Sequence, residues 1–167
     1  MEKKILLIED DTGMRNMLRV YLEKKGYSVT PAKDGEEGID ILNSEAFPLV
    51  ITDLKMPGKD GIEVLKAVRS RNKKTRIIIA TAYASLDTAL KALKLGASEY
   101  VIKPFQDLEK DLGRVIDRLF RSIDLSRENQ QLIQNLRERQ KLIDQELEMA
   151  MHVQRSLLPI QPDVKGL

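Results

Sequence analysis

The stretch LVITDLKMPGKDG, residues 49–61, is the most informative part of the sequence. Apolar and β-branched residues lead directly into one carboxylate, Asp53, and a Lys, a Met and a Pro-Gly pair follow. The first run is typical of a buried strand and the Pro-Gly pair is typical of a turn. A buried strand that ends in one acid indicates either an ordinary turn residue or a chemical site.

Short apolar runs alternate with helix-like segments along most of the chain. The predicted strands are KILLIE, YSVTPA, PLVITD, RIIIA and EYVIK, and Pro31 places the second at an edge of the sheet. The amphipathic segments between them are predicted helices, two of which end at Gly26 and Gly96. This alternation predicts an α/β fold, a doubly wound parallel sheet covered on both faces, over residues 1–121.

Local signals also indicate where helices begin. Asp34 and Asp60 are each followed three residues later by Glu, which is the spacing of a capping box. For the first helix we expect Thr12 to be the N-cap, with Asp11 as the alternative.

Composition limits the classes of function. The 167 residues carry a net charge of only +2, so no electrostatic argument favours nucleic acid or an anionic membrane. The absence of cysteine excludes disulfides and thiolate metal sites. The N-terminal apolar run is too short for a signal peptide and no later run approaches a membrane span. We therefore expect a cytoplasmic protein without membrane or nucleic-acid contacts.

Charged and polar side chains follow the predicted strands. The first strand ends in Glu9 and Asp10 and the third ends in Asp53, while the fourth runs into Thr81 and the fifth into Lys103. In doubly wound sheets ligands bind beyond these carboxyl ends. Clustered carboxylates hold a proton or bind a cation, and hard oxygen ligands favour Mg²⁺ or Mn²⁺. Asp53 then has a role as a phosphoryl acceptor, with Lys103 and Thr81 as contacts for phosphate oxygens.

Each of these residues also has an ordinary explanation when taken singly. An acid after a strand is commonly a turn residue, and a Lys before a Pro carries no signal. The joint arrangement at four strand ends is what favours a chemical site.

Four motifs carry a resemblance to a known family: LLIEDD, ITDLKMPGKDG, IIIATAYAS and GASEYVIKPF. With them, residues 1–121 resemble a response-regulator receiver domain (CheY-like) of two-component signalling. The resemblance implies a flavodoxin-like sheet with strand order 2-1-3-4-5. It also implies that the partner is a sensor histidine kinase or a phosphotransfer protein.

The resemblance assigns roles around the acid at residue 53. It implies that Asp53 is the phosphoacceptor and that Asp10 binds Mg²⁺ directly, with Glu9 acting through water. The backbone carbonyl of Lys55 is the implied third protein ligand. Many family members have Asp where this chain has Glu9, a departure that should preserve metal binding. Another family of phosphoryl-transfer enzymes also uses an Asp nucleophile at the end of a strand, but it has a second Asp two residues later. This chain has Lys55 at that position, which argues against membership of that family.

The resemblance also implies a switch. Thr81 and Tyr100 are the implied switch pair and Lys103 the phosphate contact, with a cis bond before Pro104. Phosphorylation would draw Thr81 toward the new oxygen and let Tyr100 turn inward. The fourth helix, fifth strand and fifth helix would report the change.

A long helix is predicted from Phe105 to about Leu158. An upstream apolar row, Leu112, Ile116, Leu119 and Ile123, either faces the sheet or begins a coiled coil in a different phase. A second row follows at coiled-coil spacing, consisting of Leu132, Leu136, Ile143, Ala150, Val153 and Leu157.

Polar residues lie on this second row. Asn129 lies on it, Arg139 and Glu146 interrupt it, and Ile133 and Leu147 widen it. We expect residues 122–158 to form a parallel coiled coil that makes a homodimer, with Asn129 as a register device. The alternative is a solvated single helix or one docked on another domain.

The segment QELEMAMHVQRSLLPIQP resembles the lead-in to PPM-type serine phosphatase domains. Residues 159–167 would then begin a truncated output domain, and the full-length protein would be a serine/threonine phosphatase. This chain itself would catalyse only phosphoryl transfer to and from Asp53. The alternatives are an unphosphorylated dimer adaptor and a receiver that controls a nucleotide cyclase.

Overall fold

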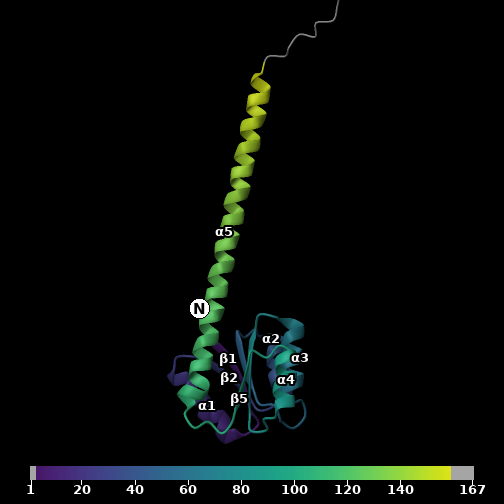
Figure 1. The fold of residues 1–167 in the computed structure, drawn as a ribbon, viewed down its shortest axis with the longest axis vertical. Helices are drawn as coiled ribbons and strands as arrows, with labels where there is room; N and C mark the ends of the chain where they lie inside the picture. The colour runs from purple at the N-terminus through teal and green to yellow at the C-terminus, as the bar shows by residue number, and fades with distance from the viewer. Residues whose placement is uncertain (1–2, 159–167) are drawn as a thin grey trace, which may run out of the picture. The chain divides into compact units, whose positions relative to one another are not determined.

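The computed structural model describes residues 3–158. Five parallel strands form one sheet in the order β2-β1-β3-β4-β5 (Figure 1). The strands are β1 (Lys4–Ile8), β2 (Ser28–Ala32), β3 (Leu49–Thr52), β4 (Arg76–Thr81) and β5 (Glu99–Ile102). The predicted α/β class, the strand order and the edge position of β2 are confirmed.

Helices cover both faces of the sheet. The first four are α1 (Thr12–Lys24), α2 (Gly35–Ser44), α3 (Gly61–Arg71) and α4 (Leu86–Lys94). Helices α2, α3 and α4 lie on one face, with α1 and the first turns of α5 (Arg114–Leu157) on the other (Figure 1). Successive side chains of a strand point to opposite faces, so Leu6 and Ile8 enter one core and Ile5 and Leu7 the other. Strands buried on both faces explain the continuous apolar runs.

The helix caps follow the sequence signals with two differences. Asp60 and Glu63 form the predicted capping box. Asp34 accepts a hydrogen bond from the Glu37 backbone, but the Glu37 carboxylate accepts from the Lys33 N–H.

The N-cap of α1 is Asp11, so the expectation of Thr12 is wrong. Asp11 has extended backbone angles and its carboxylate accepts from the Met14 N–H at 2.7 Å. Thr12 is already the first helical residue.

The last helix begins later than predicted. A π-helical segment, η1 (Glu109–Gly113), precedes α5, so helical structure starts at Glu109 and not at Phe105. The Asp111 carboxylate accepts hydrogen bonds from the backbone N–H groups of Gln106 and Asp107, which holds these residues in a loop.

The upstream apolar row faces the sheet. Its members pack with Ile5, Leu7 and Ile78 and are buried, namely Leu112, Ile116, Leu119 and Ile123. Of the two expectations for this row, the one that places it against the sheet is confirmed.

The described chain divides into two compact units between Ile123 and Asp124. In the second unit α5 continues to Leu157, and every side chain from Asp124 to Leu158 except that of Arg127 is exposed. The Lys103–Pro104 bond is cis, as expected. Within residues 3–158 no helix is long and apolar enough to cross a membrane. The expected start of an output domain, residues 159–167, lies outside the described residues.

Candidate functional site

Four neighbouring strands, β1, β3, β4 and β5, bring the expected site residues to one edge of the sheet. Glu9 and Asp10 directly follow β1, and Asp53 directly follows β3. Because β1 and β3 are neighbours, the Asp53 N–H donates to the Ile8 carbonyl at 3.1 Å and continues the ladder. The Lys103 N–H likewise donates to the Thr81 carbonyl at 2.9 Å, which extends the pairing of β4 and β5.

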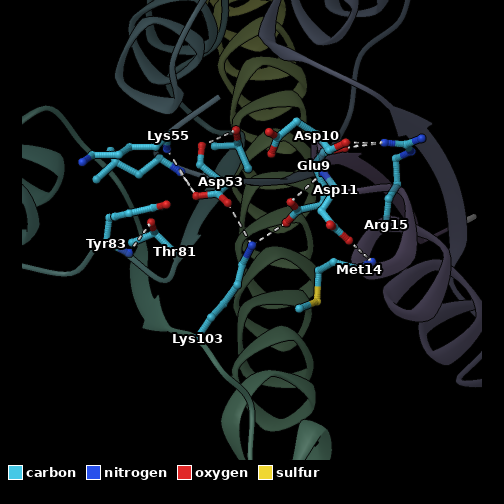
Figure 2. Close-up of polar contacts among 12 residues, drawn as sticks. Glu9, Asp10, Asp11, Met14, Arg15, Asp53, Lys55, Thr81, Tyr83 and Lys103 are labelled. Atoms are coloured by element: carbon cyan, nitrogen blue, oxygen red, sulfur yellow. Dashed lines mark hydrogen bonds and ion pairs between the residues drawn. The ribbon is translucent and has the colours of Figure 1, made fainter. Parts of the chain in front are cut away.

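The Lys103 ammonium joins two acids from different strands (Figure 2). Its Nζ atom lies 2.5 Å from Glu9 Oε2 and 2.9 Å from Asp53 Oδ2. All three residues are buried, with exposed fractions of 3% for Glu9, 8% for Asp53 and 8% for Lys103. Buried charges are tolerated only when paired, so this contact is what allows two carboxylates to lie beneath the surface together.

Burial acts on the protonation of both partners. It raises the pKa of the Glu9 carboxyl above its ordinary 4.5, although the Lys103 contact opposes the rise. Burial alone would lower the pKa of Lys103, but hydrogen bonds to Glu9 and Asp53 outweigh it and hold this pKa above 10.5. Lys103 is therefore a permanent cation at neutral pH.

The acids still outnumber the cation. Glu9, Asp10 and Asp53 each offer a carboxylate oxygen, and these oxygens lie within 4.8 Å of one another. Asp10 is exposed while the other two are buried, so a bound ion would keep a side open to water and to a ligand. Hard oxygen donors that converge in this way fit Mg²⁺ or another hard divalent ion.

Backbone groups hold the Asp53 carboxylate in place. Its Oδ1 atom accepts from the Leu54 N–H at 2.5 Å and more weakly from the Lys55 N–H at 3.3 Å. Gly61, the first residue of α3, packs directly against this corner, because a Cβ there would lie 2.2 Å from the Asp53 carbonyl oxygen. Only glycine allows the close approach of α3 that fixes the loop after β3.

Lys55 lies at the rim of the pocket. It lines the same surface pocket as Glu9, Asp53 and Lys103. Its side chain is exposed, and Nζ lies 4.3 Å from the centre of the Tyr83 ring. The expected ligand role of its carbonyl remains a prediction. Neither the sequence pattern nor the resemblance indicated the contact with Tyr83.

Arg15 is a second residue that sequence reasoning missed. Its Nη1 atom donates to the Glu9 carbonyl at 2.7 Å and to the Asp10 carbonyl at 3.3 Å (Figure 2). An arginine on an amphipathic helix carries no signal of this role, since the contact depends on how α1 packs beside the end of β1.

The expected switch residues have separate partners. Thr81 is fully buried at the end of β4, and its hydroxyl accepts from the Tyr83 N–H at 3.1 Å. The Tyr100 hydroxyl is 2.9 Å from the Thr88 hydroxyl of α4. This hydrogen bond already attaches the half-buried Tyr100 to α4, the helix expected to report a change.

Comparison with known proteins identifies the family of this fold. The family model described as the response regulator receiver domain matches residues 5–112. The chain belongs to the response regulator receiver family. It is the receiver domain of a two-component response regulator, as the sequence motifs implied.

Curated relatives of different length contain segments similar to this receiver. It is 40% identical over 105 residues to sporulation initiation phosphotransferase F of Bacillus subtilis (strain 168), covering 63% of this chain and 85% of that protein. It is 39% identical over 116 residues to the uncharacterized transcriptional regulatory protein YkoG of the same strain, covering 69% of this chain and 50% of that protein. The chain thus spans most of one of these relatives and half of the other.

Solved structures show the same receiver architecture. The chemotaxis protein CheY4 of Vibrio cholerae superposes with a TM-score of 0.66 at 30% identity, covering 71% of this chain and 99% of that one. The response regulator protein TrrA of Thermotoga maritima, solved in complex with Mg²⁺-BeF, gives 0.64 at 34% identity, with 71% and 99% covered.

Proposed function

We propose that this receiver accepts a phosphoryl group on the Asp53 carboxylate, with Mg²⁺ held by Glu9, Asp10 and Asp53. The observation that carries the proposal is the buried contact of Lys103 with Glu9 and Asp53 beside a third, exposed acid. The solved relative that contains Mg²⁺-BeF supports the choice of ion. Mn²⁺ satisfies the same oxygen chemistry.

The residues divide the work of the transfer. One Asp53 oxygen attacks the phosphorus of the donor, an O–P bond forms, and the P–N or P–O bond of the donor breaks with the electron pair leaving on the donor. Lys103 moves its ammonium contact from the carboxylates to a phosphoryl oxygen, and the Thr81 hydroxyl donates to another. The Lys55 carbonyl completes the protein ligands. The bound ion supplies positive charge where the phosphoryl oxygens gather.

The donor in this proposal is a sensor histidine kinase or a phosphotransfer protein. The open pocket supports it, since a phosphohistidine must reach Asp53 from outside. Phosphorylation would draw Thr81 toward the new oxygens and release Tyr100 from Thr88. Because Thr88 lies on α4, that change would alter the surface of α4 and β5.

The output belongs to the same proposal. Residues 122–158 would form a dimeric linker that carries the state of the receiver to a PPM-type serine/threonine phosphatase. The run MAMHVQRSLLP, residues 149–159, supports this output, because it resembles the helix that precedes such domains.

Asp53→Asn tests the central claim. With acetyl phosphate and Mg²⁺, the unchanged protein should gain a phosphoryl group that is visible as a retarded band on a phosphate-affinity gel. Asp53→Asn should lose essentially all of this band, because an amide is a poor nucleophile. Removal of Mg²⁺ with a chelator should have the same effect.

Asp11→Asn is the matched control, since it removes an acid from the same pocket and asparagine remains a good N-cap. It should keep the band. A band that survives in Asp53→Asn would falsify the assignment of the phosphoacceptor.

A further inference from the structure

The second unit exposes an unusual amount of apolar surface. Its exposed large apolar side chains are Leu125, Leu132, Ile133, Leu136, Leu142, Ile143, Leu147, Met149, Met151, Val153, Leu157 and Leu158. A helix of this length with so much apolar surface is poorly supported alone in water. A partner helix of similar length would cover it.

Most of these side chains lie in three rows with a seven-residue repeat, and Leu142, Met149, Met151 and Leu158 lie outside them. The central row contains Asn129, Leu136, Ile143, Ala150 and Leu157. The charged row lies to one side of it and contains Leu125, Leu132, Arg139, Glu146 and Val153. The glutamine row lies to the other side and contains Ile133, Gln140, Leu147 and Gln154. The central row with either neighbour has the alternating spacing of three and four that a coiled-coil seam needs.

Two seams are therefore possible: the charged seam, formed by the central and charged rows, and the glutamine seam, formed by the central and glutamine rows. Charge distinguishes them. In a parallel dimer each seam residue meets the same residue of the second copy. The charged row would therefore set Arg139 against Arg139 of the partner subunit, and Glu146 likewise. The glutamine row brings only neutral side chains together, so it avoids like charges in a seam that excludes water.

The flank of the glutamine seam adds an attraction. When Gln140 lies in the seam, Arg139 lies on one side of the seam. Asp144, five residues after Arg139, lies on the other side. These are the positions that form ion pairs between the chains of a parallel coiled coil. Arg139 would then meet Asp144 of the partner subunit.

The structure already provides part of this arrangement. Gln140 Nε2 donates to Asp144 Oδ1 of its own helix at 2.9 Å. This bond pairs one N–H of an amide placed in the seam and holds the Asp144 carboxylate at its edge.

We propose that a second copy of this chain docks in parallel, with the central and glutamine rows of the two helices facing each other. On each side of this seam, Arg139 of one chain forms an ion pair with Asp144 of the partner subunit. This inference rests on the dimeric linker of the proposed function and deepens it by naming the seam and its ion pairs. Arg139 and Glu146 then flank the seam and do not interrupt it.

Disulfide formation tests which row lies in the seam. The chain has no cysteine, so a single introduced cysteine can form a disulfide only with the same cysteine of a second copy. Gln140→Cys and Leu147→Cys should cross-link about tenfold faster under mild oxidation than Arg139→Cys and Glu146→Cys, because only seam positions bring two Cβ atoms to within about 4 Å. Faster cross-linking at 139 and 146 would establish the charged seam. A dimer that cross-links at none of the four positions would be antiparallel. A chain that sediments as a monomer would show that no second copy binds. Each of these three results would overturn the proposal.

A charge exchange tests the ion pair. Arg139→Glu and Asp144→Arg should each raise the dissociation constant of the dimer about tenfold in sedimentation, since each places like charges on facing flanks. The double variant should return close to the original value. Lys141→Glu, on the side of the helix away from both rows, should leave the constant unchanged. Failure of the double variant to recover would exclude this pairing.

The same variants separate the two proposals. Uptake of phosphoryl from acetyl phosphate should be unchanged in all of them, because residues 139–147 lie in the second unit and Asp53 in the first. Lost dimerisation with intact uptake contradicts this inference alone. Intact cross-linking without uptake contradicts the proposed function alone.

Discussion

At the scale of single residues, Lys103 determines the state of the site. Its ammonium is the cation that the buried Glu9 and Asp53 share, although the sequence separates it from them by 94 and 50 residues. In the proposed transfer the same ammonium would leave these carboxylates to contact a phosphoryl group. Lys103 and a divalent ion would then compete for the same negative charge.

Lys103→Met makes this competition measurable. Without metal the variant should lose about 3–5 kcal/mol of stability, because the two buried carboxylates lose their partner. Millimolar Mg²⁺ should then raise its melting temperature more than that of the unchanged protein, since no ammonium opposes the ion. Thermal melts with and without Mg²⁺ provide the measurement.

Lys55→Met is the control for this change. Lys55 lines the same pocket, but its side chain is exposed. Its removal should leave metal-free stability nearly unchanged. Equal stabilities of the Lys103 and Lys55 variants without metal would show that the buried contact contributes little.

At the scale of elements, a charged cluster fixes the start of α5 to α1. Lys25 Nζ lies 2.8 Å from Glu109 Oε2 and 3.1 Å from Asp117 Oδ2. The Tyr21 hydroxyl donates to Glu109 at 2.7 Å, and the Tyr27 hydroxyl donates to Asp117. The cluster ties α1 and the residue before β2 to the π-helical segment and to the first turn of α5, so it fixes that turn within the first unit.

The Asp117 carboxyl gives this cluster a pH dependence. Partial burial would raise its pKa, but the hydrogen bonds from Tyr27 and Lys25 outweigh burial and hold the pKa below 3.8. A depressed pKa means that the stabilisation is present above about pH 3.8 and is lost as the pH falls through the lower value of the folded protein.

Asp117→Asn should therefore lower the free energy of unfolding by about 1 kcal/mol at neutral pH, after allowance for solvent screening. At the acid end of the range it should change this free energy very little. Urea unfolding from pH 7 to pH 2.5 would measure the difference. Asp124→Asn, an exposed acid on the same helix, should show no such trend. A cost that is the same at every pH would mean that the charge of Asp117 does not matter.

At the scale of the whole molecule, the apolar core of the first unit ends with Ile123. Ile116, Leu119, Phe120 and Ile123 are buried against the sheet, while the side chains from Asp124 to Leu158 are exposed except for that of Arg127. The first turns of α5 are thus part of the receiver core, and the rest of the helix takes no part in it.

Truncation separates these two parts of α5. A chain that ends after Ile123 should melt within a few degrees of the full chain but should sediment as a monomer. A chain that ends after Val115 should not fold, because it loses four buried apolar side chains worth about 1.5–3 kcal/mol each. Circular dichroism and sedimentation would measure both. A dimer from the shorter folded chain would place the contact in the receiver itself.

Patterns within a few residues were enough to predict much of this protein. Continuous apolar runs specify strands buried on both faces, and parallel strands bring their carboxyl ends to one edge. That reasoning placed Glu9, Asp10, Asp53 and Lys103 together before any coordinates were considered. The capping box at Asp60 and the apolar row that begins at Leu112 are local patterns of the same kind.

Other features depended on tertiary packing. Asp11 caps α1 because of its backbone angles, the loop before Glu109 is held by Asp111, and Arg15 reaches the end of β1 because of how α1 packs. The contact of Tyr100 with Thr88 depends on how α4 lies beside β5, and the sharing of Lys103 between two acids depends on side chains from three strand ends. Local sequence fixes which residues arrive at an edge, because periodicity and strand direction are short-range properties. Which atoms pair there depends on segments distant in sequence, so only the folded chain decides it.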